Sequence, residues 1–411
     1  MHRGLKNCAM LSVLALALAA CSDPITLEYR YAIGAPSQST PLVTDSYIAF
    51  GSQGGLTILE VNGEKRCFFP THREVISAPK TDGNLIFFGS VNYIFYAINE
   101  RCEEVWKYST RDRVKSDPLV ADDLVFISSY DGHLYALQPD SGREVWIFPP
   151  RDLEENSMDL ESQGFEADNK AETAAEETVN TEAAEAPAAE AAPEAAPEPE
   201  KVDLKVGDFS YSSPLYHEGV IYLGNLDFYM YAINADDGTL KWRFKTQAPV
   251  TSSPIVVDGG LYFGSNDGNI YAIQLEPLTT LWKLPTRDWV NSSPTFADGS
   301  IFIGTNDRHI LSIDAKSGQQ KWSFETEGPA ISIPVPHKNL VIGAGSSGDG
   351  QVYALARDTG KLFWKFRTGG SIKSDPVLKN DLLYVTSGDG YFYAFRIRKT
   401  TTKALHLKVF F

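Results

Sequence analysis

Hydrophobic and polar residues alternate in short runs along most of the chain, and pairs of turn residues separate the runs. In the segment 255–274, IVVDGGLYFGSNDGNIYAIQ, the alternation is interrupted at Asp258-Gly259 and at Asp267-Gly268. This pattern is typical of antiparallel strands joined by tight hairpins. Similar breaks occur at Asp82-Gly83, Asp131-Gly132, Asp298-Gly299, Asp349-Gly350 and Asp389-Gly390. The pattern therefore predicts an all-β protein built from short antiparallel strands.

A proline-centred segment repeats along the chain. Its prolines are 38 to 42 residues apart, except for one interval of 96 residues between Pro118 and Pro214. The eight repeat prolines are Pro41, Pro79, Pro118, Pro214, Pro254, Pro294, Pro334 and Pro376. Units of roughly 40 residues with four short strands are typical of β-propeller blades. We therefore predict an eight-bladed β-propeller of four-stranded antiparallel blades.

Tryptophan is a second marker, in constant register with the first. Five tryptophans each lie twelve residues before a repeat proline: Trp106, Trp242, Trp282, Trp322 and Trp364. Trp146 is the same marker, separated from Pro214 by an insertion, and Tyr29 and Cys67 occupy this register before Pro41 and Pro79. The last unit has no such marker after it. We therefore expect the N-terminal strand, which carries Tyr29, to be the outermost strand of the last blade and to close the ring.

The tryptophans belong to a longer pattern, Ala-x5-Gly-x3-Trp. It is intact at Ala136/Gly142/Trp146, Ala232/Gly238/Trp242 and Ala354/Gly360/Trp364, and altered at Ala272/Leu278/Trp282 and Ser312/Gly318/Trp322. It resembles the tryptophan-docking motif of pyrroloquinoline-quinone-type propeller repeats, from Leu27 to about Ile397 outside the insertion. In that family the indole of one blade stacks on the glycine peptide of the next blade. The resemblance implies a structural docking role for Trp106, Trp146, Trp242, Trp282, Trp322, Trp364 and Tyr29.

Two of the four cysteines fall on docking positions of this motif. Cys67 stands at the tryptophan position of the first copy, and Cys102 stands at the glycine position of the second. These positions touch each other in the family that the repeats resemble. We therefore expect a Cys67–Cys102 disulfide in place of one stacking contact, since thiols tend to pair in an oxidising compartment. The alternative is two buried free thiols.

Residues 1–20 have the features of a signal peptide. Arg3 and Lys6 precede an apolar run from Leu11 to Ala20, which is too short to span a membrane. The run ends in Leu18-Ala19-Ala20-Cys21, which resembles the lipobox of bacterial lipoproteins. The resemblance implies cleavage before Cys21, acylation of Cys21 with palmitate or a similar chain, and a lipidated linker over 21–26. By resemblance to Gram-negative lipoproteins, Ser22 after the cysteine, in place of Asp, favours sorting to the periplasmic face of the outer membrane. The alternative is an ordinary secretory signal.

An insertion interrupts the repeats at residues 151–206. It consists largely of Ala, Glu and Pro and has almost no aromatic residues, so we expect it to be disordered. Residues 151–208 hold 18 acidic and 4 basic residues, a net charge of −14 against −16 for the whole chain. The acidity therefore says little about the propeller, which we expect to have blades 1–3 in 27–150 and blades 4–8 in 207–397. The tail 398–411 has no place in this scheme.

Catalytic motifs are absent from the sequence. It has no Cys-x-x-Cys-His, no His-Glu-x-x-His, no phosphate-binding loop and no nucleophile elbow. Quinone dehydrogenases of similar propeller type usually carry a vicinal cysteine pair, and no adjacent cysteines occur here. We therefore predict a protein without catalytic residues, bound metal or cofactor. A quinone-dependent dehydrogenase remains as the enzymatic alternative.

The connectors between blades hold the candidate binding residues. Segments 70–79, 109–118 and 285–294 share a polar, Arg-rich stretch before the repeat proline. Trp289 is the only tryptophan outside the docking register, and Trp and Arg are enriched in interaction hot spots. The predicted partner-binding residues are Trp289, Arg287, Arg111, Arg113 and Arg73, with Lys115 and Lys373 on the same face. The alternative is a solvated rim whose arginines pair with Asp112 and Asp288.

A lipoprotein signal, eight blades and the missing catalytic set together resemble the BamB family, the scaffold lipoproteins of the outer-membrane β-barrel assembly machinery. Connector loops of that family dock on a periplasmic domain of BamA. The resemblance implies a non-enzymatic scaffold that is a monomer within a complex with a BamA-like protein, is held at the membrane by its lipid, and binds no nucleic acid. The BamA-contacting residues of the family are not found here, and the acidic insertion is a departure. The alternative is a periplasmic propeller that recognises a saccharide or another protein.

Overall fold

The computed structural model describes residues 24–150 and 212–398. The predicted signal peptide, Cys21, the acidic insertion and the tail after Arg398 lie outside the described residues. Two units are distinguished, Met1–Phe148 with Gly207–Phe411, and Pro149–Val206. The propeller described below belongs to the first unit. The described part of the chain includes no helix long and apolar enough to cross a membrane.

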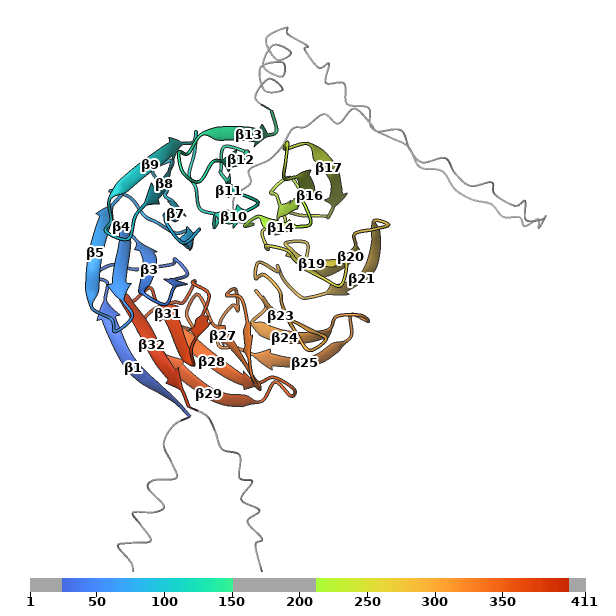
Figure 1. Cartoon of the computed structure of the whole chain (residues 1–411). Coiled ribbons are helices and arrows are strands. Elements are labelled where there is room, and N and C mark those ends of the chain that lie inside the picture. Colours follow the sequence, from blue (N-terminus) through green and yellow to red (C-terminus); the bar gives the residue numbers. More distant parts are fainter. Residues whose placement is uncertain (1–23, 151–211, 399–411) are drawn as a thin grey trace, which may run out of the picture. The chain divides into compact units, whose positions relative to one another are not determined.

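The described residues form thirty-two strands in eight four-stranded antiparallel sheets, arranged as blades around a common axis (Figure 1). The predicted fold class is confirmed. From the inner to the outer strand, blades 1 to 4 are β2 (Leu42–Val43), β3 (Tyr47–Ser52), β4 (Gly55–Glu60), β5 (Lys65–Pro70); β6 (Lys80–Thr81), β7 (Ile86–Gly89), β8 (Ile94–Ile98), β9 (Glu104–Ser109); β10 (Leu119–Ala121), β11 (Leu124–Ser128), β12 (Leu134–Leu137), β13 (Glu144–Phe148); and β14 (Leu215–His217), β15 (Val220–Gly224), β16 (Tyr229–Asn234), β17 (Leu240–Lys245). Blades 5 to 8 are β18 (Ile255–Val257), β19 (Gly260–Ser265), β20 (Asn269–Gln274), β21 (Thr279–Pro285); β22 (Thr295–Ala297), β23 (Ser300–Thr305), β24 (His309–Asp314), β25 (Gln320–Glu325); β26 (Val335–His337), β27 (Leu340–Ala344), β28 (Gln351–Ala356), β29 (Leu362–Arg367); and β30 (Val377–Lys379), β31 (Leu382–Thr386), β32 (Tyr391–Ile397), β1 (Ile25–Ala32).

The sequence pattern within a blade follows from how blades pack. Each blade has a neighbour on both faces, so its two middle strands are buried on both sides; all six residues of β19 are buried. The outer strand β21 alternates between exposed and partly buried residues instead. The hairpin between β18 and β19 turns at Asp258 (φ 49°) and Gly259 (φ 75°). Two successive left-handed residues fit the tight hairpin that the Asp-Gly pair predicts.

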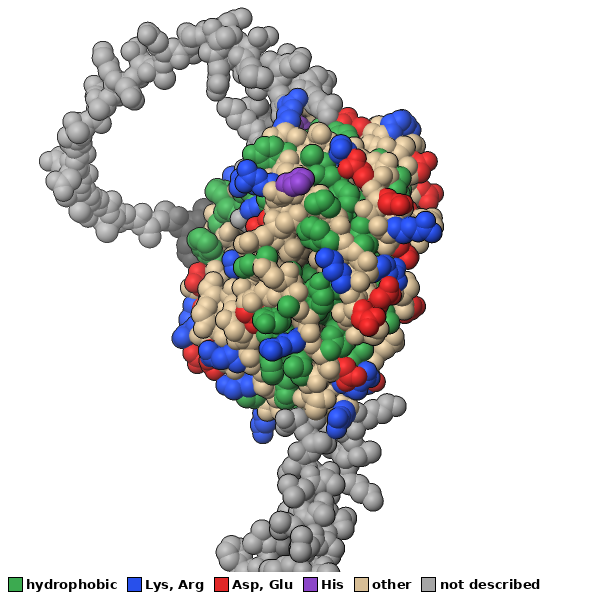
Figure 2. Space-filling model, turned by 90° about the vertical axis from the view of Figure 1, so that its left-hand side faces the viewer, with side chains coloured by type: hydrophobic (Ala, Val, Ile, Leu, Met, Phe, Trp, Pro, Cys, Tyr) green, Lys and Arg blue, Asp and Glu red, His purple; other side chains and the backbone are tan. Residues whose placement is uncertain are grey.

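The outer edges of the blades carry isolated apolar side chains. Leu27, Phe68 and Val105 on β1, β5 and β9 are exposed. Figure 2 views the propeller from the side of these strands and shows hydrophobic side chains interspersed with lysine and arginine. Single exposed apolar residues are normal on protein surfaces, so this side presents no distinct candidate interface.

The two ends of the propeller close the ring together. Strand β1 pairs antiparallel with β32, from Ile25 opposite Ile397 to Ala32 opposite Tyr391. The expected closing strand is therefore confirmed, and it begins two residues before the predicted Leu27. The backbone N–H of Arg398 donates to the carbonyl of Pro24 at 2.9 Å, so both described ends of the propeller lie at the same face.

A second set of contacts joins the blades near the axis. We call the contact between two neighbouring blades a seam and name it by its blades. The residue before a repeat proline donates its backbone N–H to the side chain at the same position in the next blade. At seam 4–5 Ser213 donates to Ser253 Oγ at 2.8 Å, and at seam 5–6 Ser253 donates to Ser293 Oγ at 2.9 Å. The other four bonds of this kind run from Ala78 to Asp117, Asp117 to Ser213, Ile333 to Asp375 and Asp375 to Thr40.

Two seams have an apolar residue where this acceptor would be, Ala78 at seam 1–2 and Ile333 at seam 6–7. At these two seams the serine two residues before the repeat proline forms the bond between the blades instead. Ser39 Oγ donates to the carbonyl of Ser77 at 2.9 Å, and Ser292 Oγ donates to the carbonyl of Ser332 at 3.0 Å. All eight seams are thus bonded on their inner side. Because every blade supplies both a donor and an acceptor, the bonds close into a ring.

Towards the outside, four seams have the stacking contact of the docking motif. The indole N–H groups donate at 2.7 to 2.8 Å to a carbonyl three residues before a glycine of the next blade, from Trp106 to Pro139, Trp146 to Ala235, Trp282 to Ala315 and Trp322 to Arg357. The ring covers that glycine so closely that a Cβ at Gly238 would lie 2.6 Å from Trp146. At seam 8–1 the ring of Tyr29 covers Gly63 in the same way, and its hydroxyl donates to the carbonyl of Val61 at 3.2 Å.

Two docking tryptophans have no glycine to cover. Trp242 faces a blade with Leu278 at the glycine position, and Trp364 faces blade 8, whose outer strand comes from the other end of the chain. Trp364 packs edge-on against Phe395 instead, with ring centroids 5.4 Å apart. Among the described residues neither indole donates a hydrogen bond, so these two positions hold their seams by packing alone.

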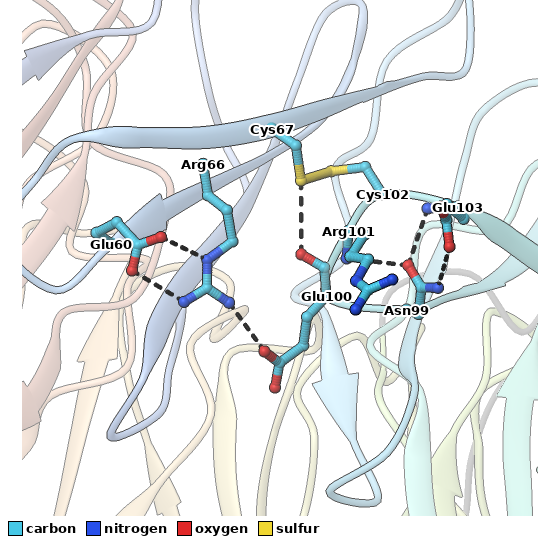
Figure 3. Close-up of a disulfide and its surroundings, with 8 residues drawn as sticks. All are labelled: Glu60, Arg66, Cys67, Asn99, Glu100, Arg101, Cys102 and Glu103. Carbon is cyan, nitrogen blue, oxygen red and sulfur yellow. Dashed lines mark hydrogen bonds and ion pairs between the residues drawn. A yellow bond between two sulfur atoms is a disulfide. The ribbon is translucent and has the colours of Figure 1, made fainter.

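The structure contains the expected disulfide between Cys67 on β5 and Cys102 in the β8–β9 hairpin (Figure 3). The two Cα atoms are 6.1 Å apart, within the range that a disulfide requires. Cys102 has a φ of 62°, close to the 67° of Gly142 at the equivalent position of the next blade. The covalent bond therefore takes the place of the indole–glycine contact at seam 1–2.

An ion-pair cluster supports the disulfide at this seam. Arg66 Nε donates to Glu60 on its own blade at 2.7 Å, and Arg66 Nη1 donates to Glu100 on blade 2 at 2.9 Å (Figure 3). The hydrogen bond from Arg66 lowers the pKa of Glu60 and, in turn, raises the pKa of Arg66. One guanidinium thus joins the two blades that the disulfide joins.

Removing the disulfide should destabilise the propeller. We expect Cys67→Ala with Cys102→Ala to lower the free energy of unfolding by about 2–4 kcal/mol, since the bond restricts the unfolded chain. The variant Cys67→Trp with Cys102→Gly should recover part of this loss, because glycine suits the positive φ and allows the indole to stack. Chemical denaturation followed by circular dichroism measures all three proteins. Equal stability of the two double variants would show that seam 1–2 does not accept the tryptophan contact.

Asp375 should make the stability depend on pH. Burial raises the pKa of Asp375 to about 6. The nearby Asp117 carboxylate also raises this pKa, whereas the hydrogen bond from the Ile333 N–H lowers it. The folded-state pKa lies above the ordinary value of 3.8. The stabilisation from protonated Asp375 is therefore complete below about pH 3.8 and is lost as the pH rises through about 6. Asp375→Asn keeps an acceptor oxygen and does not ionise. We expect the stability of the variant relative to the parent to increase from about pH 4 to about pH 6 and to be constant above about pH 7, as measured by urea denaturation. The same difference at about pH 4 and at about pH 7 would contradict this assignment.

Candidate functional site

The connectors that lead from an outer strand to the next inner strand all leave the ring on one face, because each blade has four alternating strands. We call this the connector face. Six described connectors share a threonine at their start and a buried Val, Ala or Ile four residues later. They are 71–75, 110–114, 246–250, 286–290, 326–330 and 368–372.

Two residues fix the backbone of each connector, the threonine at its start and the buried aliphatic residue at its end; we call these two residues the frame. The hydroxyl of Thr286 donates to the carbonyl of Asp288 at 2.7 Å, and the five equivalent threonines make the same bond at 2.6 to 2.8 Å. Val290 is completely buried and packs against Gly264 on the preceding blade. The three residues in between differ from connector to connector, and they read HRE, RDR, QAP, RDW, EGP and GGS. These triplets therefore give each connector its own chemistry on this face.

Trp289 is presented to solvent by a rigid backbone. Its side chain is 53% exposed. Its own N–H donates to Asp288 Oδ1 at 2.7 Å, and its carbonyl accepts the N–H of Asn306 from blade 6 at 3.0 Å. An exposed indole on a fixed peptide loses little conformational entropy when it binds a partner, which suits an interface anchor.

The arginines of the connector face differ in their surroundings. Arg113 pairs with Asp112 at 3.2 Å and lies over the ring of Tyr130 at 4.6 Å, with Lys115 over the same ring at 4.7 Å. Arg287 is exposed, and Asp288 accepts the Trp289 N–H instead of pairing with it. No ion pair of Arg287 occurs among the described residues. The solvated-rim alternative thus applies to Arg113 and not to Arg287.

The predicted residues share one face but do not form one site. Arg73 belongs to the connector of seam 1–2, and Arg111 and Arg113 belong to that of seam 2–3. Arg287 and Trp289 lie at seam 5–6, three connectors further round the ring. Arg111 also supports the fold, because its N–H donates to Asp131 of blade 3 at 2.8 Å.

A recess of about 450 Å³ opens between blades 5 and 6 beside Arg287. Leu284, Arg287, Asp307, His309 and Leu311 contribute to its lining. His309 Nδ1 lies 3.4 Å from the carboxylate of Asp307. The sequence reasoning missed this recess, although both leucines depart from a repeat pattern that is legible in the sequence. The recess brings a guanidinium, an imidazole and a carboxylate together with two leucine side chains.

The aspartate side chains of the Asp-Gly hairpins on the same face already accept hydrogen bonds from the protein. In blade 5, Asp267 accepts hydrogen bonds from Tyr271 at 2.6 Å and from the N–H of Gln247 at 3.1 Å. Burial alone would raise the pKa of Asp267, but the bonds from Tyr271, Asn269 and Gln247 outweigh it and leave the pKa lowered. Burial and the Asp267 carboxylate raise the pKa of Tyr271. These hairpin carboxylates therefore have a structural role.

On the opposite face an open recess of about 710 Å³ lies between blades 2 and 3. Four aspartates line it, namely Asp82, Asp122, Asp123 and Asp140. Within residues 24–150 and 212–398 no group of three or more His, Cys, Asp or Glu side chains is arranged to hold a metal ion.

A closed ring of blades, held by a docking motif and carrying variable triplets on one face, defines a β-propeller of the pyrroloquinoline-quinone-type repeat. The model of the family named outer membrane protein assembly factor BamB matches residues 62–164, 196–288, 226–342 and 330–403. The matches cover more than half of the chain, and the chain belongs to this family.

Two solved structures show the same fold. BamB from Moraxella catarrhalis is 14% identical, with a TM-score of 0.67 over 91% of this chain and 98% of that chain. The computationally designed Ika8 protein is 12% identical, also with a TM-score of 0.67, over 90% and 98%. Since a designed propeller fits as well as BamB does, these likenesses establish the fold alone. No curated protein matches the sequence.

Substitutions at adjacent connector positions should separate the anchor from the frame. We expect Trp289→Ala to change the free energy of unfolding by less than about 0.5 kcal/mol, because the indole is exposed. Val290→Ala should cost about 1–3 kcal/mol through the cavity it leaves. Thermal and urea denaturation of both variants tests this difference. A large loss for Trp289→Ala would make the indole part of the core rather than a free anchor.

Proposed function

We propose that the chain is a non-enzymatic scaffold lipoprotein that assists the assembly and insertion of outer-membrane β-barrel proteins. In this proposal the connector face docks on a periplasmic domain of a BamA-like protein, and Trp289 and Arg287 are its anchors. The main support is membership of the BamB family, together with a rigid connector that presents an exposed indole and an unpaired guanidinium.

The position of the N-terminus is consistent with a role at the membrane. Strand β1 begins at the face opposite the connectors, and Pro24 lies three residues after Cys21. Three residues span at most about 11 Å. A lipid on Cys21 would therefore hold the opposite face close to the periplasmic surface of the outer membrane, and the connector face would point into the periplasm.

Affinity purification from crosslinked envelopes tests this function. We expect barrel-assembly components to co-purify with the tagged parent chain and to decrease for Trp289→Ala and for Arg287→Ala. Arg101→Ala changes an exposed arginine in the β8–β9 hairpin, on the face opposite the connectors, and serves as the matched control. Failure of the parent chain to capture any barrel-assembly component would overturn the proposal in favour of a saccharide- or protein-recognition propeller. Spectra of the parent with added quinone and calcium test the enzymatic alternative separately.

A further inference from the structure

Six of the eight seams contain the same pair of aromatic rings. A tyrosine on the third strand of one blade packs edge-on against an aromatic residue on the outer strand of the preceding blade. The ring centroids are 5.3 to 5.8 Å apart and the planes are 62° to 73° apart, in Phe69–Tyr96, Tyr108–Tyr135, Phe148–Tyr231, Phe244–Tyr271, Phe324–Tyr353 and Phe366–Tyr393. Such pairs stabilise a contact beyond the apolar area that they bury.

The tyrosine hydroxyl also has a constant partner. In five of these blades it donates to the aspartate four residues earlier, at 2.5 to 2.9 Å, in Tyr135–Asp131, Tyr231–Asp227, Tyr271–Asp267, Tyr353–Asp349 and Tyr393–Asp389. In blade 2 the amide of Asn92 donates to the hydroxyl of Tyr96 at 2.8 Å. The seam thus has a slot for a phenol ring, with a polar group at its end.

Seam 5–6 keeps the aspartate and lacks both rings. Leu284 stands at the outer-strand position and Leu311 at the tyrosine position, and both line the recess of about 450 Å³. The hydroxyl of Thr305 donates to Asp307 Oδ1, and no described residue donates to Asp307 Oδ2. In the aromatic seams it is Oδ2 that accepts the hydroxyl of Tyr231, Tyr271 or Tyr393. The recess is therefore an aromatic slot whose ring is missing and whose acceptor is retained.

Beside the slot, the positive charge of Arg287 has no acidic partner among the described residues. At seam 6–7 the residue equivalent to Arg287 is Glu327, which pairs across the seam with Lys365 at 3.0 Å and with Arg367. The corresponding partners of Arg287 would be Ser323 and Glu325. Ser323 is neutral, and Glu325 pairs with Arg308 of its own blade at 3.1 Å. Arg287 therefore remains available for an acidic group from outside.

We propose that this slot binds a tyrosine side chain of a partner polypeptide, with an acidic residue beside that tyrosine pairing with Arg287. The phenol ring packs between Leu284 and Leu311, where the other seams hold their own rings, and its hydroxyl donates to Asp307. Trp289, two residues from Arg287, covers the adjoining backbone of the partner. A volume of this size accommodates a side chain with its neighbours. The inference rests on the proposed function in one respect, that the ligand of the connector face is a protein.

The test uses a short acetylated peptide that carries meta-fluorotyrosine next to aspartate, titrated with the complete mature protein and followed by fluorine NMR. We expect the fluorine shift to change and saturate with the parent. Leu311→Tyr should weaken binding by about tenfold or more, because an internal ring then fills the slot as in six other seams. Arg287→Ala should weaken it by up to about fivefold, as for an exposed ion pair. Arg101→Ala, on the opposite face, should leave the affinity unchanged.

Matched peptides check each half of the ligand. Replacing the aspartate by asparagine should reproduce the loss seen with Arg287→Ala, and it should have no further effect on that variant. Replacing the fluorotyrosine by meta-fluorophenylalanine removes the hydroxyl bonded to Asp307 and should weaken binding to the parent. These comparisons remain decisive even if Leu311→Tyr does not fold. Equal affinity of parent and Leu311→Tyr, or no saturation with the parent at millimolar protein, would overturn the slot.

The two proposals fail in different ways. If the peptide binds as expected but barrel-assembly components do not co-purify with the parent, the slot stands and the proposed function is wrong. If those components co-purify equally with the parent and with Leu311→Tyr, the proposed function stands and the slot is not the docking point.

Discussion

The structure depends on the sideways packing of each blade on the next, because a four-stranded blade has two apolar faces and neither can be left in water. A ring of eight seams buries all of them at once, and it must close for the first and last faces to be covered. Strand β1 performs this closure by pairing with β32 along its whole length. The hydrogen bonds of the pre-proline positions repeat the closure near the axis. The ring is thus held on its inner side by polar bonds and on its outer side by docking contacts.

The outer contact takes several chemical forms while the geometry stays the same. Four of the eight seams use an indole over a glycine, seam 8–1 uses Tyr29, and seam 1–2 uses a disulfide. Cys102 adopts the left-handed conformation that glycine has elsewhere, so the backbone of the motif is retained although both of its side chains have changed. A seam therefore requires close approach of two backbones, and more than one pair of side chains provides it.

Function is separated from this framework within each connector. The threonine and the buried aliphatic residue belong to the fold. The first of the three residues between them is exposed in all six connectors, and all three are exposed only in 287–289. Trp289 and Arg287 belong to the variable part, and their neighbours Thr286 and Val290 belong to the frame. The same separation explains why a likeness in fold to a designed propeller carries no function. What distinguishes one propeller from another lies in the triplets and in seams that depart from the common pattern.

The sequence alone determined the number of blades and the closing strand, because both follow from the register of a repeat along the chain. The pairing of Cys67 with Cys102 was expected because the docking motif that the repeats resemble brings these two positions into contact. The face that carries Trp289 was predictable for the same reason, since every connector of a repeat leaves on the same side. Tertiary structure alone decided which arginines are already paired. Arg113 lies against Asp112 and Tyr130, whereas the positions equivalent to the partners of Glu327 hold a neutral serine and a glutamate that pairs with Arg308. The slot at seam 5–6 is likewise formed by residues of two blades, Leu284 and Leu311, and the space they leave exists only once those blades are packed together.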